Sequence, residues 1–260
     1  MIGRRLLIAG NWKMNLDLYG SYQLAKMVAE GTKSFENIDV LISPSFISLG
    51  VIGQKLKDTE LLIAAQNCHY EESGAFTGEI SLDMIRSTGV NWVIIGHSER
   101  RALFGESDEI VAKKIKYALS NRFHVIGCVG ESLEQRENGE QEEVVQKQLD
   151  TILRDLSESE LENLVIAYEP VWAIGTGKTA TPEQAEEMHE FIRKIVSKIA
   201  GEDRGKSILI LYGGSVSLRN AEELLNQTDI DGALIGGASL EAESFNGIAA
   251  IAEDISKEQG

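Results

Sequence analysis

The feature that most constrains the fold is a series of eight short apolar runs distributed along the whole chain. Each run is almost continuously apolar, as expected for a parallel strand whose two faces are both covered. The runs are RRLLIAG from Arg4, IDVLIS from Ile38, ELLIAAQ from Glu60, NWVIIGH from Asn91, FHVIGCV from Phe123, NLVIAYE from Asn163, SILILYG from Ser207 and DGALIGG from Asp231. This series predicts eight buried parallel strands.

Amphipathic segments with helical periodicity lie between these runs. Apolar residues recur at intervals of three and four within 185–199 and again within 144–156. The segment Thr181-Pro182-Glu183-Gln184 has the pattern of a capping box with proline at the first helical position. Eight strand–helix units in 260 residues favour an α/β fold in which residues 1–260 form one (β/α)8 TIM barrel domain. Because periodicity does not establish closure, an open doubly wound sheet remains the alternative.

The charge of the chain restricts its partners. With 25 basic and 41 acidic residues, the formal net charge is −16 at pH 7. A surface of this charge repels nucleic acid and anionic membrane, so we expect neither as a partner. Only Cys68 and Cys128 occur, and no segment has the length of a signal h-region or a membrane span. These observations predict a soluble cytoplasmic protein.

One glycine-rich segment raises the question of nucleotide binding. Gly175-Thr176-Gly177-Lys178-Thr179 resembles a P-loop, but the first glycine of that motif would have to replace Trp172. The same segment fits G-x-G-x-x-A, yet the residues about twenty positions later have helical spacing and lack the acidic strand end of a dinucleotide fold. The sequence therefore argues against a nucleotide site here.

Polar residues gather where the predicted strands end. In a barrel the catalytic groups lie at the carboxyl ends of the strands, whereas the strand starts carry nothing comparable in this sequence. The strand ends hold Asn11 and Lys13, Ser43, Gln66 and Asn67, His97 and Glu99, Cys128 and Glu131, Glu169, Gly213-Gly214-Ser215, and Gly236-Gly237.

Three of these side chains are candidates for chemistry, each with a plainer alternative. Lys13 supplies a local cation for an anionic substrate in an acidic protein, or is a surface lysine with a buried stem. His97 ends the run WVIIGH and is followed by SERR, where it is a candidate for chemistry or merely caps a strand. Glu169 follows LVIAY in apolar company, where burial would raise its pKa and suit a general base. A buried structural ion pair is the alternative for Glu169.

The glycines after the seventh and eighth runs point to an anion. Barrel phosphate sites are built from these two loops, and glycine lets backbone N–H groups approach phosphate oxygens closely. Tight turns alone would also favour glycine. No two histidines have metal-ligand spacing, so we expect no metal site.

Taken together, these motifs resemble the triosephosphate isomerase family over almost the whole chain and in the same order. The matching segments are GNWKMN (10–15), QNC (66–68), GAFTGEIS (74–81), IGHSERR (95–101), CVGE (128–131), AYEPVWAIGTG (167–177), LYGGSV (211–216) and IGGASL (235–240). The resemblance implies interconversion of dihydroxyacetone phosphate and D-glyceraldehyde 3-phosphate without a cofactor.

The resemblance also implies a role for each site residue. Glu169 would be the base that moves the proton, and His97 the neutral electrophile at the carbonyl. Lys13 would be the electrostatic partner of the substrate and the enediolate, with Asn11 positioning the substrate and Glu99 supporting Lys13 and His97. Residues 170–180 would form a lid. The implied substrate-binding residues are Asn11, Lys13, Gly175, Ser215, Gly236 and Gly237.

The segment EESGAFTGEI resembles the family loop that enters a neighbouring subunit, which implies a homodimer with Thr77 near the tip of that loop. Within the loop, HYEES departs from the family pattern, and Ser43-Pro44-Ser45 replaces paired prolines after the second strand. Two other functions remain open: a Schiff-base aldolase on the same fold with Lys13 as nucleophile, and a barrel that binds a ligand without catalysis.

Overall fold

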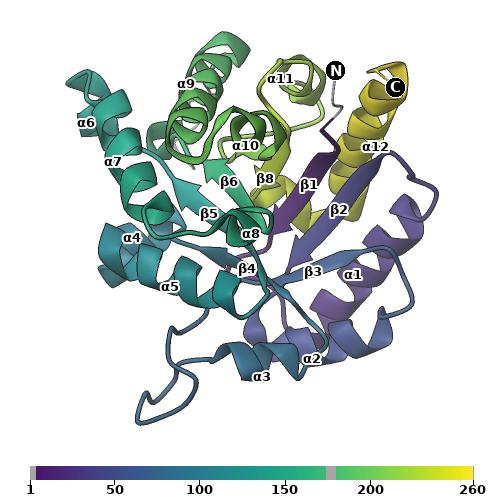
Figure 1. The fold of residues 1–260 in the computed structure, drawn as a ribbon. Coiled ribbons are helices and arrows are strands. Elements are labelled where there is room, and N and C mark those ends of the chain that lie inside the picture. Colours follow the sequence, from purple (N-terminus) through teal and green to yellow (C-terminus); the bar gives the residue numbers. More distant parts are fainter. Residues whose placement is uncertain (1–3, 174–179, 260) are drawn as a thin grey trace.

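The chain forms one closed barrel of eight parallel strands surrounded by helices (Figure 1). This computed structural model describes residues 4–173 and 180–259. The strands are β1 (Leu6–Asn11), β2 (Ile38–Ser43), β3 (Leu62–Ala65), β4 (Trp92–Ile95), β5 (His124–Val129), β6 (Leu164–Tyr168), β7 (Ile210–Tyr212) and β8 (Gly232–Ile235). Each predicted apolar run coincides with one of them to within a few residues, so the prediction of eight parallel strands is confirmed.

The pairing of β1 with β8 decides between the two predicted folds. Leu7 is in register with Gly232, and Gly10 with Ile235, which closes the sheet on itself. The open doubly wound sheet is therefore wrong. Each strand from β1 to β7 also pairs in parallel with the strand that follows it in the sequence, as expected for strand–helix–strand units.

Helices cover the outside of the barrel and follow the strands in order. They are α1 (Leu18–Thr32), α2 (Phe46–Lys55), α3 (Leu82–Arg86), α4 (Ser98–Phe104), α5 (Asp108–Ser120), α6 (Leu133–Glu137), α7 (Gln141–Leu153), α8 (Glu158–Leu161), α9 (Pro182–Ala200), α10 (Glu202–Ser207), α11 (Ala221–Leu225) and α12 (Ala242–Gln259), with the 3-10 turns η1 (Val171–Ala173) and η2 (Gly237–Leu240). The predicted capping box begins α9, where the Thr181 side chain accepts from the Gln184 N–H and Pro182 is the first helical residue.

Two apolar clusters hold these layers together. The smaller one fills the interior of the barrel with inward side chains such as Leu7, Leu41, Ile94 and Leu211. The larger one lies between the strands and the surrounding helices. A filled interior leaves no pore, so a ligand can reach the barrel only at its ends.

The amino end of the barrel carries a buried ion network that contradicts the expectation for the strand starts. Arg193 of α9 donates from Nε to Asp229 Oδ1 at 2.5 Å and from Nη2 to Asp231 Oδ2 at 2.6 Å. Arg4, which precedes β1, also pairs with Asp231 at the start of β8. Charged groups therefore gather at both ends of the barrel.

No helix within the described ranges is long and apolar enough to cross a membrane.

Candidate active site

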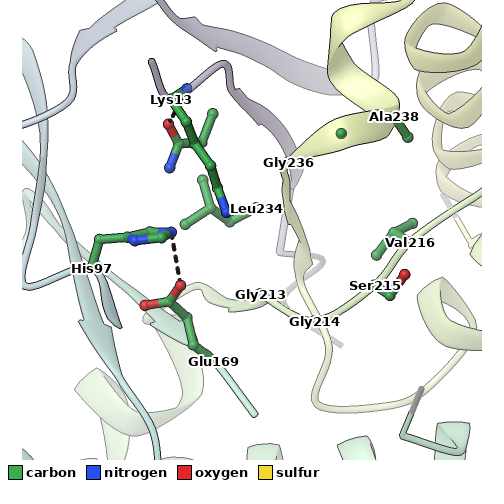
Figure 2. Close-up of a pocket in the computed structure, with 12 residues that line it drawn as sticks. Lys13, His97, Glu169, Gly213, Gly214, Ser215, Val216, Leu234, Gly236 and Ala238 are labelled. Carbon is green, nitrogen blue, oxygen red and sulfur yellow. Dashed lines mark hydrogen bonds and ion pairs between the residues drawn. The ribbon is translucent and has the colours of Figure 1, made fainter. Parts of the chain in front are cut away.

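A cavity of about 280 Å³ opens at the carboxyl ends of the strands, where the sequence predicted the site. Figure 2 shows Lys13, His97 and Glu169 on one side of it and the glycine-rich segments on the other. The lining residues are Asn11, Lys13, His97, Glu169, Gly213, Gly214, Ser215, Val216, Leu234, Gly236, Gly237 and Ala238. All the predicted site residues are among them except Glu99 and Gly175. Glu99 contacts Lys13 and His97, and Gly175 lies outside the described residues.

Lys13 reaches the cavity from an unusual backbone conformation. Its φ of 53° is in the left-handed region, which costs a non-glycine residue about 1–3 kcal/mol. The Lys13 N–H donates to Asn11 Oδ1 at 3.1 Å, and Gln66 Nε2 donates to the Lys13 carbonyl at 2.8 Å. Two side-chain amides from β1 and the end of β3 thus fix this peptide segment, and Lys13 Nζ pairs with Glu99 Oε1 at 2.7 Å.

His97, after β4, lies between the Lys13–Glu99 pair and the Glu169 carboxylate at the end of β6. The N–H of Glu99 donates to His97 Nδ1 at 3.2 Å, so Nδ1 acts as an acceptor there. The ring proton of the neutral imidazole is therefore on Nε2, which lies 3.0 Å from Glu169 Oε1. Burial lowers the pKa of His97, but the Glu169 carboxylate raises it more, and the net pKa lies above its usual value.

Glu169 is almost fully buried, with 2% of its surface exposed. Its Oε2 accepts from the Ser98 N–H at 2.8 Å, and Oε1 lies 3.2 Å from the Ser98 hydroxyl. Burial raises the pKa of Glu169, but the contacts with His97 and Ser98 outweigh it, so the net pKa is lowered. The expectation of a raised pKa is therefore wrong for this conformation, because apolar sequence neighbours do not reveal donors from another loop.

Two residues that hold this site were not assigned a role from the sequence. Ser98, the first residue of α4, anchors the Glu169 carboxylate, and its only signal was its position after His97 at a strand end. Gln66 was noted at a strand end, but its bond to the Lys13 carbonyl depends on how β1, β2 and β3 are placed side by side. Cys128 and Glu131, also strand-end residues, are fully buried and do not line the cavity.

The opposite wall is formed mostly by backbone. An ideal Cβ on Gly213 would lie 2.8 Å from Glu169 Cγ, so the glycine allows the carboxylate side chain to pack there. At Gly237 a Cβ would meet nothing within 4 Å, so that backbone faces open space. No carboxylate is on this wall, and its glycine peptides with the Ser215 hydroxyl form a surface suited to an anion.

Within the described ranges, no group of three or more His, Cys, Asp or Glu side chains is placed to hold a metal ion. The site therefore offers a buried carboxylate, a buried imidazole, an ammonium group and a glycine-rich wall around one small cavity. Groups of these kinds support proton transfer next to a carbonyl in a small anionic substrate.

Comparisons with known proteins agree with this chemistry. The family model of triosephosphate isomerase matches residues 6–252. The triosephosphate isomerase of Chloroherpeton thalassium is 52% identical over 244 residues, which cover 93% of this chain and 96% of that protein. The enzyme of the same name from Porphyromonas gingivalis is 49% identical, over 93% of this chain and 97% of its own. That of Rhodopirellula baltica is 47% identical, over 95% and 97%.

Proposed function

The chain belongs to the triosephosphate isomerase family, and from that premise we propose a role for each residue of the cavity. It is an aldose–ketose isomerase that interconverts dihydroxyacetone phosphate and D-glyceraldehyde 3-phosphate, a step of glycolysis and, in reverse, of gluconeogenesis. The two sugars differ in the position of one carbonyl, so the reaction moves one proton between adjacent carbons and one between their oxygens. A route through an enediolate needs a base, a donor at the oxygens and a nearby cation.

Glu169 is the base in this proposal. It removes the proton from the carbon beside the carbonyl, the electron pair forms the carbon–carbon double bond, and the charge moves to the oxygen. To reach the substrate, the carboxylate leaves His97 and Ser98, which lower its pKa, while the burial that raises its pKa remains. The carboxylate is therefore a stronger base against the substrate than in its present position.

His97 is the donor at the oxygens. Its Nε2 proton now faces Glu169, and a substrate oxygen takes that place when Glu169 turns away. The contact that raises the pKa of His97 is then lost and burial lowers it, which favours the neutral imidazole. The neutral ring gives its Nε2 proton to the enediolate oxygen and recovers a proton from the neighbouring hydroxyl.

Lys13 and the glycine wall hold the anionic ends of the molecule. Lys13 Nζ stabilises the developing oxygen charge, with Glu99 fixing the ammonium and Asn11 fixing the backbone of Lys13. Ser215, Gly236 and Gly237 bind the phosphate group. Gly175, the fourth phosphate donor that the family resemblance implies, lies outside the described residues and stays a prediction.

The observation that carries these assignments is the meeting of Glu169, His97 and Lys13 around one cavity. Glu169→Asp tests it, because the shorter side chain withdraws the carboxylate by about 1 Å, and a misplacement of that size can cost about a hundredfold in rate. We expect kcat to fall by that factor with a small change in KM, whereas Glu162→Asp before β6 changes neither. Near-normal kcat in Glu169→Asp would remove this residue from the role.

A Schiff-base aldolase is the rival reading of the same lysine. It requires a covalent imine between Lys13 and the substrate carbonyl. Borohydride added with dihydroxyacetone phosphate would trap such an imine as a stable adduct. We expect no adduct by mass spectrometry, because Lys13 acts here through its charge.

We further propose a homodimer built through the loop around Thr77. Exposed apolar side chains follow three adjacent strands: Met14 after β1, Ile47 after β2, and Phe76 with Met84 after β3. Met14 is 96% exposed and adjoins Lys13, so a second subunit seated there would cover the loop that carries the cation. Apolar side chains gathered in this way are typical of a protein–protein contact.

Thr77→Arg tests the dimer, because an arginine buried in a partner without a counter-ion is costly. We expect sedimentation to show monomers with weak activity, and Ser159→Arg on the exposed start of α8 to leave the assembly unchanged. An active dimer of unchanged affinity in Thr77→Arg would count against this interface.

A cytoplasmic location is the last part of the proposal. Both cysteines are buried and unpaired in the structure, which suits a reducing compartment. Measuring the activity in fractionated cells, with a cytoplasmic marker enzyme as reference, checks this location.

A further inference from the structure

We infer that the loop after β3 is ordered within the single subunit by a column of side chains, Lys113–Tyr70–His69–Phe76, which presents Thr77 to a second copy of this chain. The inference rests on the proposed homodimer and adds what prepares the subunit for it. Figure 1 shows this loop between β3 and α3 projecting away from the barrel. Residues 72–79 are all exposed, so little of the hydrophobic core holds them in place.

The base of the loop is closed by backbone. The His69 N–H donates to the Ile80 carbonyl at 2.8 Å and joins the two ends. Between these residues the Phe76 N–H reaches the Gly74 carbonyl at 3.0 Å, and the Glu79 N–H reaches the Phe76 carbonyl at 3.0 Å. These few bonds define the turn, but they do not tie it to the rest of the subunit.

The column supplies that connection. Lys113 Nζ of α5 lies 3.6 Å from the centre of the Tyr70 ring and 3.5 Å from Glu71 Oε1. The Tyr70 ring stacks on His69 with 4.4 Å between centres and 25° between planes. His69 in turn meets the Phe76 ring at 4.4 Å. A continuous line of contacts thus runs from a helix of the barrel to the residue before Thr77.

Gly74 makes room for the outer end of the column. Its φ is 142°, and an ideal Cβ there would lie 2.9 Å from Phe76 Cε2. Any side chain at position 74 would therefore be strained and would push the phenylalanine ring from His69.

The column matters for association because ordering a loop at an interface reduces affinity. A loop that already has its bound conformation in the free subunit avoids that cost. Lys113 contributes one cation–π contact and one exposed ion pair, which together correspond to about a three- to tenfold change in an equilibrium constant. The expected effect is therefore a moderate change in the dimer dissociation constant.

Lys113→Met tests the inference with the full-length chain, because it keeps an apolar stem and removes the cation. Sedimentation over a dilution series gives the dimer dissociation constant, and hydrogen exchange on dilute samples reports the protection of amides 72–79. We expect the constant to rise about three- to tenfold and loop exchange to become faster. The value of kcat at concentrations where the variant is fully dimeric should match the parent.

Two further variants make the result specific. Lys113→Arg retains a cation that stacks on tyrosine and should restore most of the affinity. Lys194→Met on α9 removes another exposed lysine, which pairs with Glu190, and should change neither measurement.

An unchanged dissociation constant in Lys113→Met, with the parent dimeric, overturns the inference and leaves the proposed dimer intact. A rise of the same size in Lys194→Met also overturns it, because net charge alone would then explain the effect. A parent chain that stays monomeric at every concentration overturns the dimer and the role of the column together.

Discussion

The two ends of the barrel both hold charged side chains, but they partner them in opposite ways. At the amino end, Arg193 donates to Asp229 and Asp231 and also to the Gly205 and Ile208 carbonyls. At the carboxyl end, Lys13 has one carboxylate partner, Glu99, and faces a cavity of about 280 Å³. The Arg193 guanidinium at the amino end is thus surrounded by protein acceptors, whereas Lys13 at the carboxyl end also faces open space.

The ion network at the amino end and the cavity at the carboxyl end have different consequences. A largely buried guanidinium with several acceptors fixes the elements that carry them, because removing it leaves the buried Asp229 and Asp231 carboxylates without this partner. Around the cavity, Glu169 has donors that it must exchange for a substrate, which makes its pKa depend on where it points. The amino end therefore serves stability and the carboxyl end serves chemistry, and substitutions should separate the two.

The largest effect is expected from Arg193→Met at the amino end. Breaking a buried ion network by removing one partner costs about 3–5 kcal/mol of unfolding free energy. For a chain of this length that corresponds to a fall in Tm of roughly 6–20 °C. Urea unfolding and calorimetry measure the loss, and kcat/KM below the transition should stay within about twofold of the parent, since no cavity residue is touched.

Lys194→Met, on the next residue of the same helix, is the matched control. Its amine pairs with Glu190 at the surface, and such pairs contribute about 0–1 kcal/mol. If Arg193→Met unfolded no more easily than this control, the amino-end network would not be the stabilising one. A large loss of kcat with normal stability would reverse the comparison between the two ends.

The sequence predicted most of the carboxyl end and missed the amino end, for a physical reason. Strand ends are marked locally, because a polar residue such as Glu169 directly follows a buried run. The amino-end network joins Arg4 before β1, Arg193 on α9 and Asp231 before β8, which are far apart along the chain. No local pattern links them, so their meeting depends on closure of the barrel, which periodicity does not establish.

The same limit explains the errors within the site. Residue types and positions identified Lys13, His97 and Glu169 as cavity residues, and the fold brings them together. The lowered pKa of Glu169 was not predictable, because it depends on Ser98 and His97 from a different strand–helix connection. The left-handed backbone of Lys13 is likewise held in part from outside its own segment, because Gln66 at the end of β3 donates to the Lys13 carbonyl in addition to the local bond to Asn11.

Lys13→Met is expected to have the next largest effect, and it acts on activity alone. Among the described lining residues Lys13 is the only lysine or arginine, in a chain whose net charge of −16 repels the substrate. Loss of one preorganised donor at a developing oxyanion costs about 10²–10³ in rate. We expect kcat/KM for glyceraldehyde 3-phosphate to fall by at least that factor with Tm within a few degrees of the parent. A fall below tenfold would exclude Lys13 as the electrostatic partner.

Acid should also weaken the amino end, through His189. This ring is fully buried, its Nδ1 lies 3.3 Å from the Asp229 carbonyl, and burial lowers its pKa from 6.5 to about 3. The unfolded chain therefore binds this proton more readily than the folded one. The contribution of the neutral His189 ring to the unfolding free energy is fully present above about pH 6.5. It falls as the pH drops toward 3, at up to about 1.4 kcal/mol per pH unit.

Urea unfolding between pH 7 and 4 measures this dependence. His189→Asn removes the titrating ring, so its stability should fall less steeply with acid than that of the parent, by a slope equivalent to about one proton. His124→Asn, at the start of β5, is the comparison for a half-buried histidine. Parallel curves for the parent and His189→Asn would show that another group controls acid unfolding.

The smallest effect is expected from Gln66→Met, which probes whether the backbone of Lys13 is held from outside. Gln66 Nε2 donates to the Lys13 carbonyl at 2.8 Å and to the Ser43 carbonyl at 2.9 Å, and methionine fills a similar volume without either bond. Each lost hydrogen bond is worth about 1 kcal/mol, so the segment at φ 53° should relax and move Nζ from the cavity. We expect kcat/KM to fall about tenfold, more in kcat than in KM if Lys13 acts mainly on the transition state.

Gln227→Met on the surface after α11 should have no effect, because its side-chain amide donates to the Glu223 carbonyl and lies far along the chain from the Lys13 segment. If Gln66→Met lowered Tm strongly and left kcat/KM unchanged, Gln66 would be a structural residue, and part of the carboxyl end would resemble the amino end after all.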